Sequence, residues 1–453
     1  MPTVRAEAEN IDGGKKQKMS DYQDRYREKL MDAASVAARV EDGWVIGMDA
    51  ATAHTPKIMS ALAARAAAGE VKNVKVQTLL DVYPLEFYAD KSLDGKLNGV
   101  SWFAGGGARK AINAGFADFI PNYYRDIPKL IRSCYDYDAF CVSVSPMDEH
   151  GYFSLGCVSS YSEAMIEKSK RIFIEVNDFQ PRAVCGLQIH ISQVDGIVEN
   201  NMPLPVLPAA NIDETSRTIG GYIAELIPDG ACIQLGIGAI PDATGMALKQ
   251  KHDLGIHTEM FTDSMVELIE CGAVNNSRKQ IHRGVSVTTF AFGSQRIYDY
   301  INDNPAIALM PVDYVNDPNV ICQNDNMISI NAALEVDFWG QVCAESVGTK
   351  HMSGSGGQID YVRGATQSKG GKSFIAFTST AKGGTISKIK STLTPGAVCT
   401  TSKNDVDYIV TEYGVAHLRG QSLASRTKQL IAIAHPDFRD QLAFEAKQRG
   451  IMI

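Results

Sequence analysis

One acidic side chain, Glu259, stands in an apolar run where chemistry could take place. The run Gly255–Phe261 has strand length, and the SMVE pattern at residues 264–267 that follows it is typical of a helix start. Ligands of parallel α/β units bind beyond the carboxyl ends of the strands, which is where Glu259 falls. Glu259 is therefore a candidate catalytic residue, although a single Glu in a strand is more often an edge or surface residue.

A glycine-rich turn, GIGAIP at residues 236–241, lies just upstream of Glu259. It lacks the third glycine of the dinucleotide fingerprint, which close packing of helix on strand requires, so a nicotinamide or flavin site is disfavoured. What remains is a turn that can direct backbone N–H groups at developing negative charge. A tight turn without any ligand explains these residues equally well.

Two later stretches could also bind a ligand. Three glycines in four residues, Gly354, Gly356 and Gly357, let a ligand approach the backbone closely. Residues Lys369–Lys403 contain six lysines and no Asp or Glu, which makes a local positive field suited to phosphates. Solvated lysines on a hairpin are the alternative interpretation of that stretch.

The elements around Glu259 predict a parallel βαβ unit within Ala231–Cys271. A strand at 231–235 leads into the glycine turn, Asp242 is the expected N-cap of a helix that runs to about Lys251, and a second strand and helix follow. The handedness of such a unit is nearly obligatory. This unit places the turn and Glu259 at the same edge of the sheet.

The same pattern occurs earlier in the chain. Residues Asp42–Ile46 resemble Asp229–Ile233, and each is followed by a turn, a proline, an Ala/Leu helix and a short strand that ends in Asp. The prolines and aspartates are Pro56 and Asp81 in the first copy and Pro241 and Asp263 in the second. One α/β unit is thus used twice. The first copy has the uncharged Gln77 near the position of Glu259, so only the second supplies a carboxylate.

Length and composition exclude several classes of protein. A chain of 453 residues is long enough for two domains, each with its own core, and a net charge of −8 disfavours nucleic acid as a partner. No apolar run approaches a membrane span, no secretory signal is visible, and the nine cysteines form no C-x-x-C pair, so we expect free thiols in a cytoplasmic protein. Neither H-E-x-x-H nor a Cys/His cluster supports a metal site.

The expected domain limits follow from polar and proline-rich stretches. Residues 1–19 are polar and without periodicity, and we expect a disordered leader there. The segment Pro203–Pro208 can be neither helix nor central strand, so a boundary is expected at its end. The chain is thereby divided into an N-terminal domain, 20–208, and a C-terminal domain, 209–453, that carries Glu259.

Six motifs together resemble the acyl-CoA:carboxylate CoA-transferases of the acetyl-CoA hydrolase/transferase type. Within that group the chain is most similar to the 4-hydroxybutyrate and butyryl-CoA:acetate CoA-transferases, and the similarity extends from about Tyr22 to Arg449. The motifs are Gln234–Ala243, Leu254–Asp263, Pro311–Pro318, Ser353–Ala365, Thr411–Gly420 and Ile433–Arg439.

The resemblance implies a role for each candidate residue. Glu259 corresponds to the nucleophile and Asn316 to the asparagine beside it. The oxyanion turn falls on Gly236, Ile237 and Gly238, and the thioester loop on Gly354, Gly356, Gly357 and Gln358. Lys382 and Lys388, in the lysine-rich stretch, are the residues we expect near the nucleotide end of CoA. The implied fold is α/β, with two similar open, mostly parallel domains and the active site between them, in a homo-oligomer (dimer or tetramer).

The resemblance also implies the reaction. A short-chain acyl-CoA, butyryl-CoA or 4-hydroxybutyryl-CoA, transfers its CoA to acetate in a ping-pong sequence through an acyl–glutamyl anhydride and a glutamyl-CoA thioester. Coenzyme A is then a substrate, with no tightly bound cofactor and no metal. The alternatives are acetyl-CoA hydrolysis, or succinyl- or propionyl-CoA:acetate transfer, on the same scaffold. A non-catalytic sensor of acyl-CoA or a sugar phosphate is a more remote one.

Overall fold

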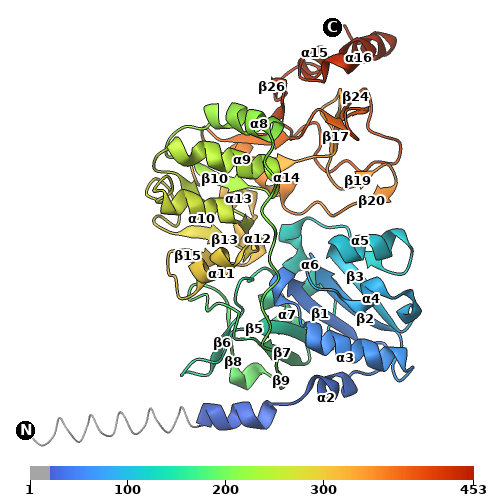
Figure 1. Cartoon of the computed structure of the whole chain (residues 1–453), viewed down its shortest axis with the longest axis vertical. Coiled ribbons are helices and arrows are strands. Elements are labelled where there is room, and N and C mark those ends of the chain that lie inside the picture. The colour runs from blue at the N-terminus through green and yellow to red at the C-terminus, as the bar shows by residue number, and fades with distance from the viewer. Residues whose placement is uncertain (1–20, 453) are drawn as a thin grey trace, which may run out of the picture.

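The computed structural model describes residues 21–452 and contains two large, mostly parallel β-sheets flanked by helices (Figure 1). The first sheet uses residues 45–199 and the second uses residues 232–417. The predicted fold class, with two mostly parallel α/β domains, is therefore confirmed. The expected leader, 1–19, lies outside the described residues, and the exact domain limits stay a prediction.

The N-terminal sheet has seven strands in the order β4-β3-β2-β1-β5-β7-β9, and every neighbouring pair is parallel. Its interior strand β5 is buried along its whole length, as expected for a sheet covered on both faces. The strands are β1 (Val45–Ala50), β2 (Val74–Leu79), β3 (Leu97–Phe103), β4 (Asp118–Phe119), β5 (Ala139–Val144), β7 (Ile172–Val176) and β9 (Gly196–Glu199).

The C-terminal sheet has six strands in the order β11-β10-β16-β21-β25-β26. All neighbours are parallel except the edge pair β25–β26, which forms a hairpin. The strands are β10 (Cys232–Leu235), β11 (Gly255–Ile256), β16 (Met327–Ala332), β21 (Lys372–Ala376), β25 (Tyr408–Thr411) and β26 (Gly414–His417).

Helices connect the parallel strands and cover the sheets, and α15 and α16 project at the end of the molecule that carries the C-terminus (Figure 1). A helix also covers residues 21–29. In the first half the helices are α2 (Ala33–Ala38), α3 (Pro56–Ala67), α4 (Glu86–Ala89), α5 (Gly106–Asn113), α6 (Ile127–Cys134) and α7 (Ser162–Lys168). In the second half they are α8 (Glu214–Glu225), α9 (Ala239–Ala247), α10 (Asp263–Glu270), α11 (Gln295–Ile301), α12 (Val312–Val315), α13 (Pro318–Ile321), α14 (Gln358–Gln367), α15 (Leu423–Ala432) and α16 (Pro436–Gln448).

Short strands form small sheets outside the two large ones. The small sheets are β6 (Tyr152–Ser154) with β8 (Gln188–His190), β12 (Met260–Phe261) with β14 (Phe290–Ala291), β13 (Ser286–Thr288) with β15 (Ile307–Leu309), β19 (Ser346–Val347) with β20 (Lys350–His351), β22 (Thr380–Ala381) with β23 (Ile386–Ser387), and β17 (Glu335–Asp337) with β18 (Val342–Cys343) and β24 (Ile389–Lys390).

The βαβ unit before Glu259 is present as β10–α9–β11, with β10 and β11 parallel. Its details differ from the prediction. The N-cap of α9 is Gly238, whose φ of 110° favours glycine, and Asp242 falls in the first turn, where a carboxylate suits the helix dipole. Helix α10 likewise begins one residue before Ser264, with Thr262 as its N-cap.

The strand predicted over Gly255–Phe261 is in fact two strands in different sheets. Gly255 and Ile256 pair with β10, whereas Met260 and Phe261 pair with β14. Glu259 therefore lies in the connection where the chain leaves one sheet and enters the other. A residue at such a junction is outside the regular ladder, so its position is set by other contacts.

The repeated unit is also present, as β1–α3–β2 with parallel strands. In each copy the Asp that ends the pattern anchors the start of a later helix. Asp81 accepts the N–H of Gly107 in the first turn of α5 at 2.9 Å, and Asp263 accepts the N–H of Ser294, the N-cap of α11, at 2.9 Å. The similarity of the copies thus extends to the following helix.

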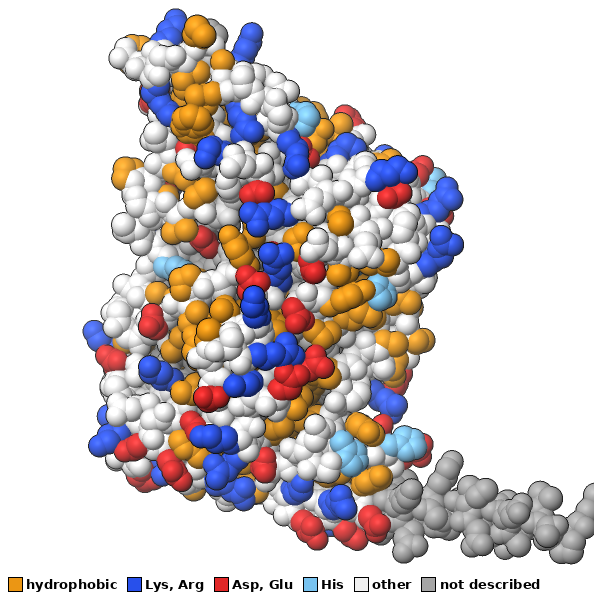
Figure 2. All heavy atoms as spheres, turned by 180° about the vertical axis from the view of Figure 1, so that it is seen from behind, with side chains coloured by type: hydrophobic (Ala, Val, Ile, Leu, Met, Phe, Trp, Pro, Cys, Tyr) orange, Lys and Arg blue, Asp and Glu red, His pale blue; other side chains and the backbone are white. Residues whose placement is uncertain are grey.

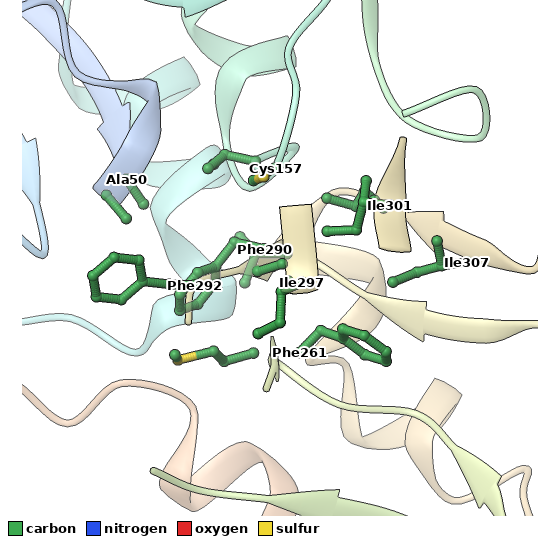
Figure 3. Close-up of a cluster of buried hydrophobic side chains, with 14 of the residues drawn as sticks. Ala50, Cys157, Phe261, Phe290, Phe292, Ile297, Ile301 and Ile307 are labelled. Carbon is green, nitrogen blue, oxygen red and sulfur yellow. The ribbon is translucent and has the colours of Figure 1, made fainter. Parts of the chain in front are cut away.

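The largest cluster of buried hydrophobic side chains belongs to both halves of the chain. Figure 3 shows Ala50 and Cys157, from the first half, in the same cluster as Phe290 and Phe292, from the second. Three smaller clusters each lie within one half. The expectation that each domain has its own core is therefore incomplete, because the main core is shared.

The face seen in Figure 2 carries charged side chains of both signs, with patches of hydrophobic side chains between them. Large hydrophobic side chains that remain exposed include Phe179, Trp339 and Phe444. Within residues 21–452, no helix has the length and apolar character that crossing a membrane requires.

Candidate active site

The backbone of Glu259 is held by residues 288–290, at the end of β13 and the start of β14. Its carbonyl accepts hydrogen bonds from the hydroxyl of Thr288 at 2.9 Å and from the N–H groups of Thr289 and Phe290 at 3.1 and 3.2 Å. Three donors on one carbonyl hold the junction between β11 and β12 in a single conformation. The side chain of Glu259 is thereby directed from a rigid support.

Asn316 lies beside the carboxylate of Glu259. Its Nδ2 donates to Oε2 of Glu259 at 2.6 Å, and the Asn316 side chain is fully buried. Asn316 is the C-cap of the single-turn helix α12, and the carbonyl of Val315 in that helix accepts from Nε2 of His257 at 2.8 Å. Burial lowers the pKa of His257 to about 3, so this imidazole is neutral and joins the Asn316 turn to the strand before Glu259.

Gly357 closes the other side of the carboxylate. A Cβ atom at Gly357 would lie 2.0 Å from Oε2 of Glu259 and 2.3 Å from Nδ2 of Asn316, so only glycine fits there. The preceding Gly356 has a φ of 54°, a conformation that glycine adopts without strain. The glycines at this point therefore allow the backbone to touch the acidic group.

The surroundings change the acidity of Glu259. Burial raises the pKa of its carboxyl to about 7, while the hydrogen bond from Asn316 and the backbone of Gly357 oppose the rise. A carboxylate that is poorly solvated in this way is more reactive as a nucleophile than one in water. The site can thus supply a reactive oxygen close to neutral pH.

A cavity of ≈ 140 Å³ opens beside Glu259, between the two sheets. Its walls come from both halves of the chain and, apart from Glu259, carry no charged side chain. They are formed by Leu79, Leu80, Trp102, Phe103, Asn122 and Tyr124 of the first half and by Gln234, Leu235, Gly236, Ile237, Met260, Phe290, Asn331 and Gly356 of the second. This space can hold a small uncharged group next to the carboxylate.

Two family models match the chain. The acetyl-CoA hydrolase/transferase N-terminal domain matches residues 14–208, and the C-terminal domain of the same family matches residues 293–446. The chain belongs to the acetyl-CoA hydrolase/transferase family. It is a CoA-transferase, as the resemblance in its motifs predicted.

Known members of the family are similar over almost their whole length. A succinyl-CoA:cyclohexane-1-carboxylate CoA transferase of Geobacter metallireducens is 47% identical, with 94% of this chain and 97% of that protein covered. A 4-hydroxybutyrate coenzyme A transferase of Clostridium kluyveri is 41% identical, with 95% and 100% covered. The crystal structure of a 4-hydroxybutyrate CoA-transferase from Porphyromonas gingivalis, 35% identical, superposes with a TM-score of 0.77 over 94% of this chain and 100% of that one.

The predicted oxyanion turn of this CoA-transferase reaches the cavity only in part. Gly236 and Ile237 line it, but the N–H of Gly236 donates to the carbonyl of Ile330 at 2.9 Å and is already used. Gly238 is the N-cap of α9 and does not line this cavity. Ile237 therefore lines the cavity, and its N–H group, unlike that of Gly236, does not donate to Ile330.

Only part of the predicted thioester loop, too, lies at the cavity or at Glu259. Gly356 lines the cavity and Gly357 touches Glu259, whereas Gly354 packs against Phe103 of the first half. Gln358 is buried, and its side chain donates to the carbonyl of Ala332 at 2.7 Å and accepts from Thr401. Its side chain is thus occupied inside the second half, which suits a role in holding the loop better than contact with CoA.

The two predicted lysines lie away from the cavity wall. Lys382 is in the turn between β22 and β23, and Lys388 donates to the hydroxyl of Thr378 at 2.9 Å. Burial lowers the pKa of Lys388, and nearby Lys390 is paired with Glu335 at 2.6 Å. Part of the positive field expected from this stretch is therefore neutralised within the protein.

Sequence reasoning placed the site between the two domains but named none of the first-half residues that line it. Tyr124 lines the cavity, its ring packs edge-on against Phe290, and its N–H donates to the carbonyl of Gly356 at 3.3 Å. The available signal was the aromatic, glycine-bearing character of residues 101–107 and 119–124, which are otherwise unusual for surface loops. Those segments carry no acid, base or nucleophile that chemistry alone would single out.

Proposed function

We propose that this CoA-transferase moves CoA between a short-chain acyl-CoA and acetate, with Glu259 as the covalent nucleophile. The observation that carries the proposal is the hydrogen bond between Asn316 and Glu259 at the wall of an uncharged cavity. Among the residues that line this cavity, Glu259 is the one whose side chain can act as a nucleophile on a thioester.

The reaction begins when an Oε atom of Glu259 attacks the thioester carbonyl carbon. The C–O bond forms, the carbonyl electron pair moves to oxygen, and collapse of this oxyanion breaks the C–S bond to give an acyl–glutamyl anhydride and CoA thiolate. The thiolate then attacks the glutamyl carbonyl and expels the acyl carboxylate, which leaves a glutamyl-CoA thioester. Acetate attacks this thioester and the same steps run in reverse, with acetyl-CoA as the product.

Three neighbours of Glu259 assist these steps. Asn316 orients the carboxylate, and the backbone around Gly357 closes the space behind it. The N–H of Ile237 is the donor we assign to the oxyanion, and a donor of this kind contributes about 3 kcal/mol to transition-state stabilisation. Binding of the distant part of CoA supplies the energy that desolvates the carboxylate.

The nucleotide end of CoA has two candidate contacts. We assign it to the lysine-rich stretch, through Lys382 and, where its bond to Thr378 opens, Lys388. A homo-oligomer, dimer or tetramer, is part of the same proposal. The first assignment follows from the lysine content of residues 369–403, which include no Asp or Glu, and the second follows from the resemblance.

The cavity favours an uncharged acyl group. Butyryl and 4-hydroxybutyryl groups suit walls made mostly of aliphatic and aromatic side chains, and relatives named for these substrates are 39–41% identical. The amides of Gln234 and Asn331 are the wall groups that could meet a distal hydroxyl. A succinyl group, by contrast, would bring a carboxylate to a wall without a cation.

A carbocyclic acyl group is the second candidate, and the cavity volume favours it. A cavity of about 150 Å³ lined by aliphatic and aromatic side chains is large enough to bind benzene, and the cavity here measures ≈ 140 Å³. The relative at 47% identity is named for cyclohexane-1-carboxylate. A six-membered ring therefore belongs in any substrate screen.

Trapping of the glutamyl thioester tests the proposal. Incubation with acyl-CoA followed by borohydride should inactivate the enzyme by reducing the thioester, and peptide mapping should place the modification on Glu259. A modification elsewhere contradicts the assignment. Acyl-CoA consumption with and without acetate, for acetyl, butyryl, 4-hydroxybutyryl, cyclohexanecarbonyl and succinyl groups, then separates transfer from hydrolysis. Binding without turnover indicates a sensor.

A further inference from the structure

Residues 122–125 of the first half contact residues 355–360 of the second half, which include the end of the loop beside Glu259, at three points. The contacts are a hydrogen bond from the Ser355 hydroxyl to the Asn122 carbonyl at 2.6 Å, one from the Tyr124 N–H to the Gly356 carbonyl at 3.3 Å, and an ion pair between Nε of Arg125 and Oδ1 of Asp360 at 3.3 Å. Only the third joins two opposite charges.

Arg125 is the partner of the buried Asp360 carboxyl group in an ion pair. The Asp360 side chain is 1% exposed, against 26% for Arg125, and its Oδ2 has no hydrogen-bond partner in the part of the chain described. Burial raises the pKa of Asp360 well above its usual value, and Arg125 is the largest influence that opposes the rise. The other ionisable groups that face Asp360 are Asp126 of the first half and Glu259, Tyr361 and Arg363 of the second.

Asp360 is well placed to act on the contact between loop and nucleophile. It lies in the first turn of α14, whose N-cap is Gly357. The backbone of Gly357 in turn touches Glu259 and Asn316. A displacement of Asp360 therefore moves the first turn of α14 and, with it, Gly357, which touches the carboxylate of Glu259. The glycines of the loop cannot fix its position by side-chain packing, so an external anchor is needed.

We propose that Arg125 and Asp360 are positioning residues for the transfer reaction. Their ion pair joins the two halves of the chain and holds the Gly356–Gly357 backbone at the distance from Glu259 that attack on the thioester requires. This inference rests on the proposed function, because it takes Glu259 as the reacting group. Neither residue lines the cavity, so neither is assigned a contact with substrate.

The chain offers a matched control. Arg182 and Asp303 form another ion pair between the two halves, at 3.4 Å, but both side chains are at least half exposed and neither contacts the loop. Loss of that pair weakens the docking of the halves without moving Gly357. A difference between the two pairs therefore separates positioning of the loop from docking in general.

The test compares kcat and KM for acyl-CoA in Arg125→Gln, Asp360→Asn, the double variant Arg125→Gln/Asp360→Asn, and Arg182→Gln. We expect Arg125→Gln to lower kcat by about 10²-fold with KM unchanged, since a displacement of about 1 Å at the reacting atoms has that effect. The double variant should have a higher kcat than Arg125→Gln, because it also replaces the buried carboxyl group that Arg125→Gln leaves without its partner. Arg182→Gln should match the wild type.

Three results would overturn the inference. They are a wild-type kcat in Arg125→Gln, an equal loss of kcat in Arg182→Gln, and a change confined to KM. If Arg125→Gln does not fold, Asp360→Asn decides, because it removes the pair without burying a lone charge: a lowered kcat supports the inference and a wild-type kcat contradicts it. Failure of the proposed function itself is visible separately, as the absence of a glutamyl thioester in the wild-type enzyme.

Discussion

A carboxylate is a weak nucleophile in water, and the residues around Glu259 change that property in a measurable way. Burial raises the pKa of Glu259 to about 7, against 4.5 in an exposed glutamate. The reacting form is the ionised one. As the pH falls below about 7 the carboxyl is therefore protonated and the nucleophile is lost, whereas an exposed glutamate would stay active down to about 4.5.

The pH dependence of kcat/KM should show this shift. This ratio reports ionisations of the free enzyme, so we expect it to rise with pH and to level off above about 7. Initial rates between pH 5 and 9, with enzyme stability checked at each pH, provide the measurement. If kcat/KM already levels off near pH 5, either Glu259 is not the ionising nucleophile or its carboxyl group is more exposed to solvent in the working enzyme.

At the residue scale, the sequence supplied the groups that react and missed those that hold them. Glu259 and Asn316 were predicted from motifs 57 positions apart, and the structure joins them by a hydrogen bond. Arg125 and Asp360 gave no signal, because single charged residues are common and their significance arises only when a distant partner is buried beside them. The bond from Lys388 to Thr378 likewise cannot be seen in the sequence, and the role of Lys388 stays a prediction.

At the element scale, the loop before α14 works because its backbone, without side chains, reaches the nucleophile. A Cβ at Gly357 would overlap Oε2 of Glu259 at 2.0 Å, while one at Gly221 on α8 would meet nothing within 4 Å. We expect Gly357→Ala to abolish turnover with the fold retained, because the new methyl group must displace either the carboxylate or the loop. Gly221→Ala should keep full activity and unfold at the same or a slightly higher temperature.

Activity assays and thermal unfolding of the two glycine variants decide this prediction. An active Gly357→Ala enzyme would mean that the loop lies farther from Glu259 in the working enzyme. A Gly357→Ala enzyme that fails to fold would instead assign Gly357 a structural role. Because both substitutions add one methyl group to a glycine, the comparison isolates the position.

The elements themselves were predicted well where a local pattern defines them and poorly where tertiary pairing does. The βαβ unit follows from apolar runs separated by a glycine turn, and β10–α9–β11 has that form. The division of residues 255–261 between two sheets could not be predicted, since the run is uniformly strand-like and only the distant partner β14 draws Met260 and Phe261 away. Gly238 displaced Asp242 as N-cap because its positive φ shapes the turn.

At the scale of the whole molecule, the internal repeat made the two-sheet architecture predictable, but it suggested more independence than the halves have. Each copy of the unit belongs to its own large sheet, yet the largest hydrophobic cluster contains side chains from both halves of the chain. Backbone hydrogen bonds also cross between them, from Ala291 to Cys157 at 2.9 Å and from Ser159 to Thr289 at 3.0 Å. The hydrophobic pattern of a sequence locates the apolar face of a helix or strand, but it does not predict which distant element that face will pack against.

The shared core predicts that the enzyme unfolds as one unit. Separation at residue 208 would expose the apolar surface of the shared cluster on both pieces, and hydrophobic burial is the main term that offsets conformational entropy. We therefore expect one calorimetric transition, with calorimetric and van't Hoff enthalpies that agree. The fragments 21–208 and 209–453 should be insoluble or unfolded when expressed alone, and should recover activity when co-expressed. Two separate transitions, or a 209–453 fragment that is folded by itself, would show instead that the smaller clusters within each half are sufficient cores and that the contact between the halves is a docking interface.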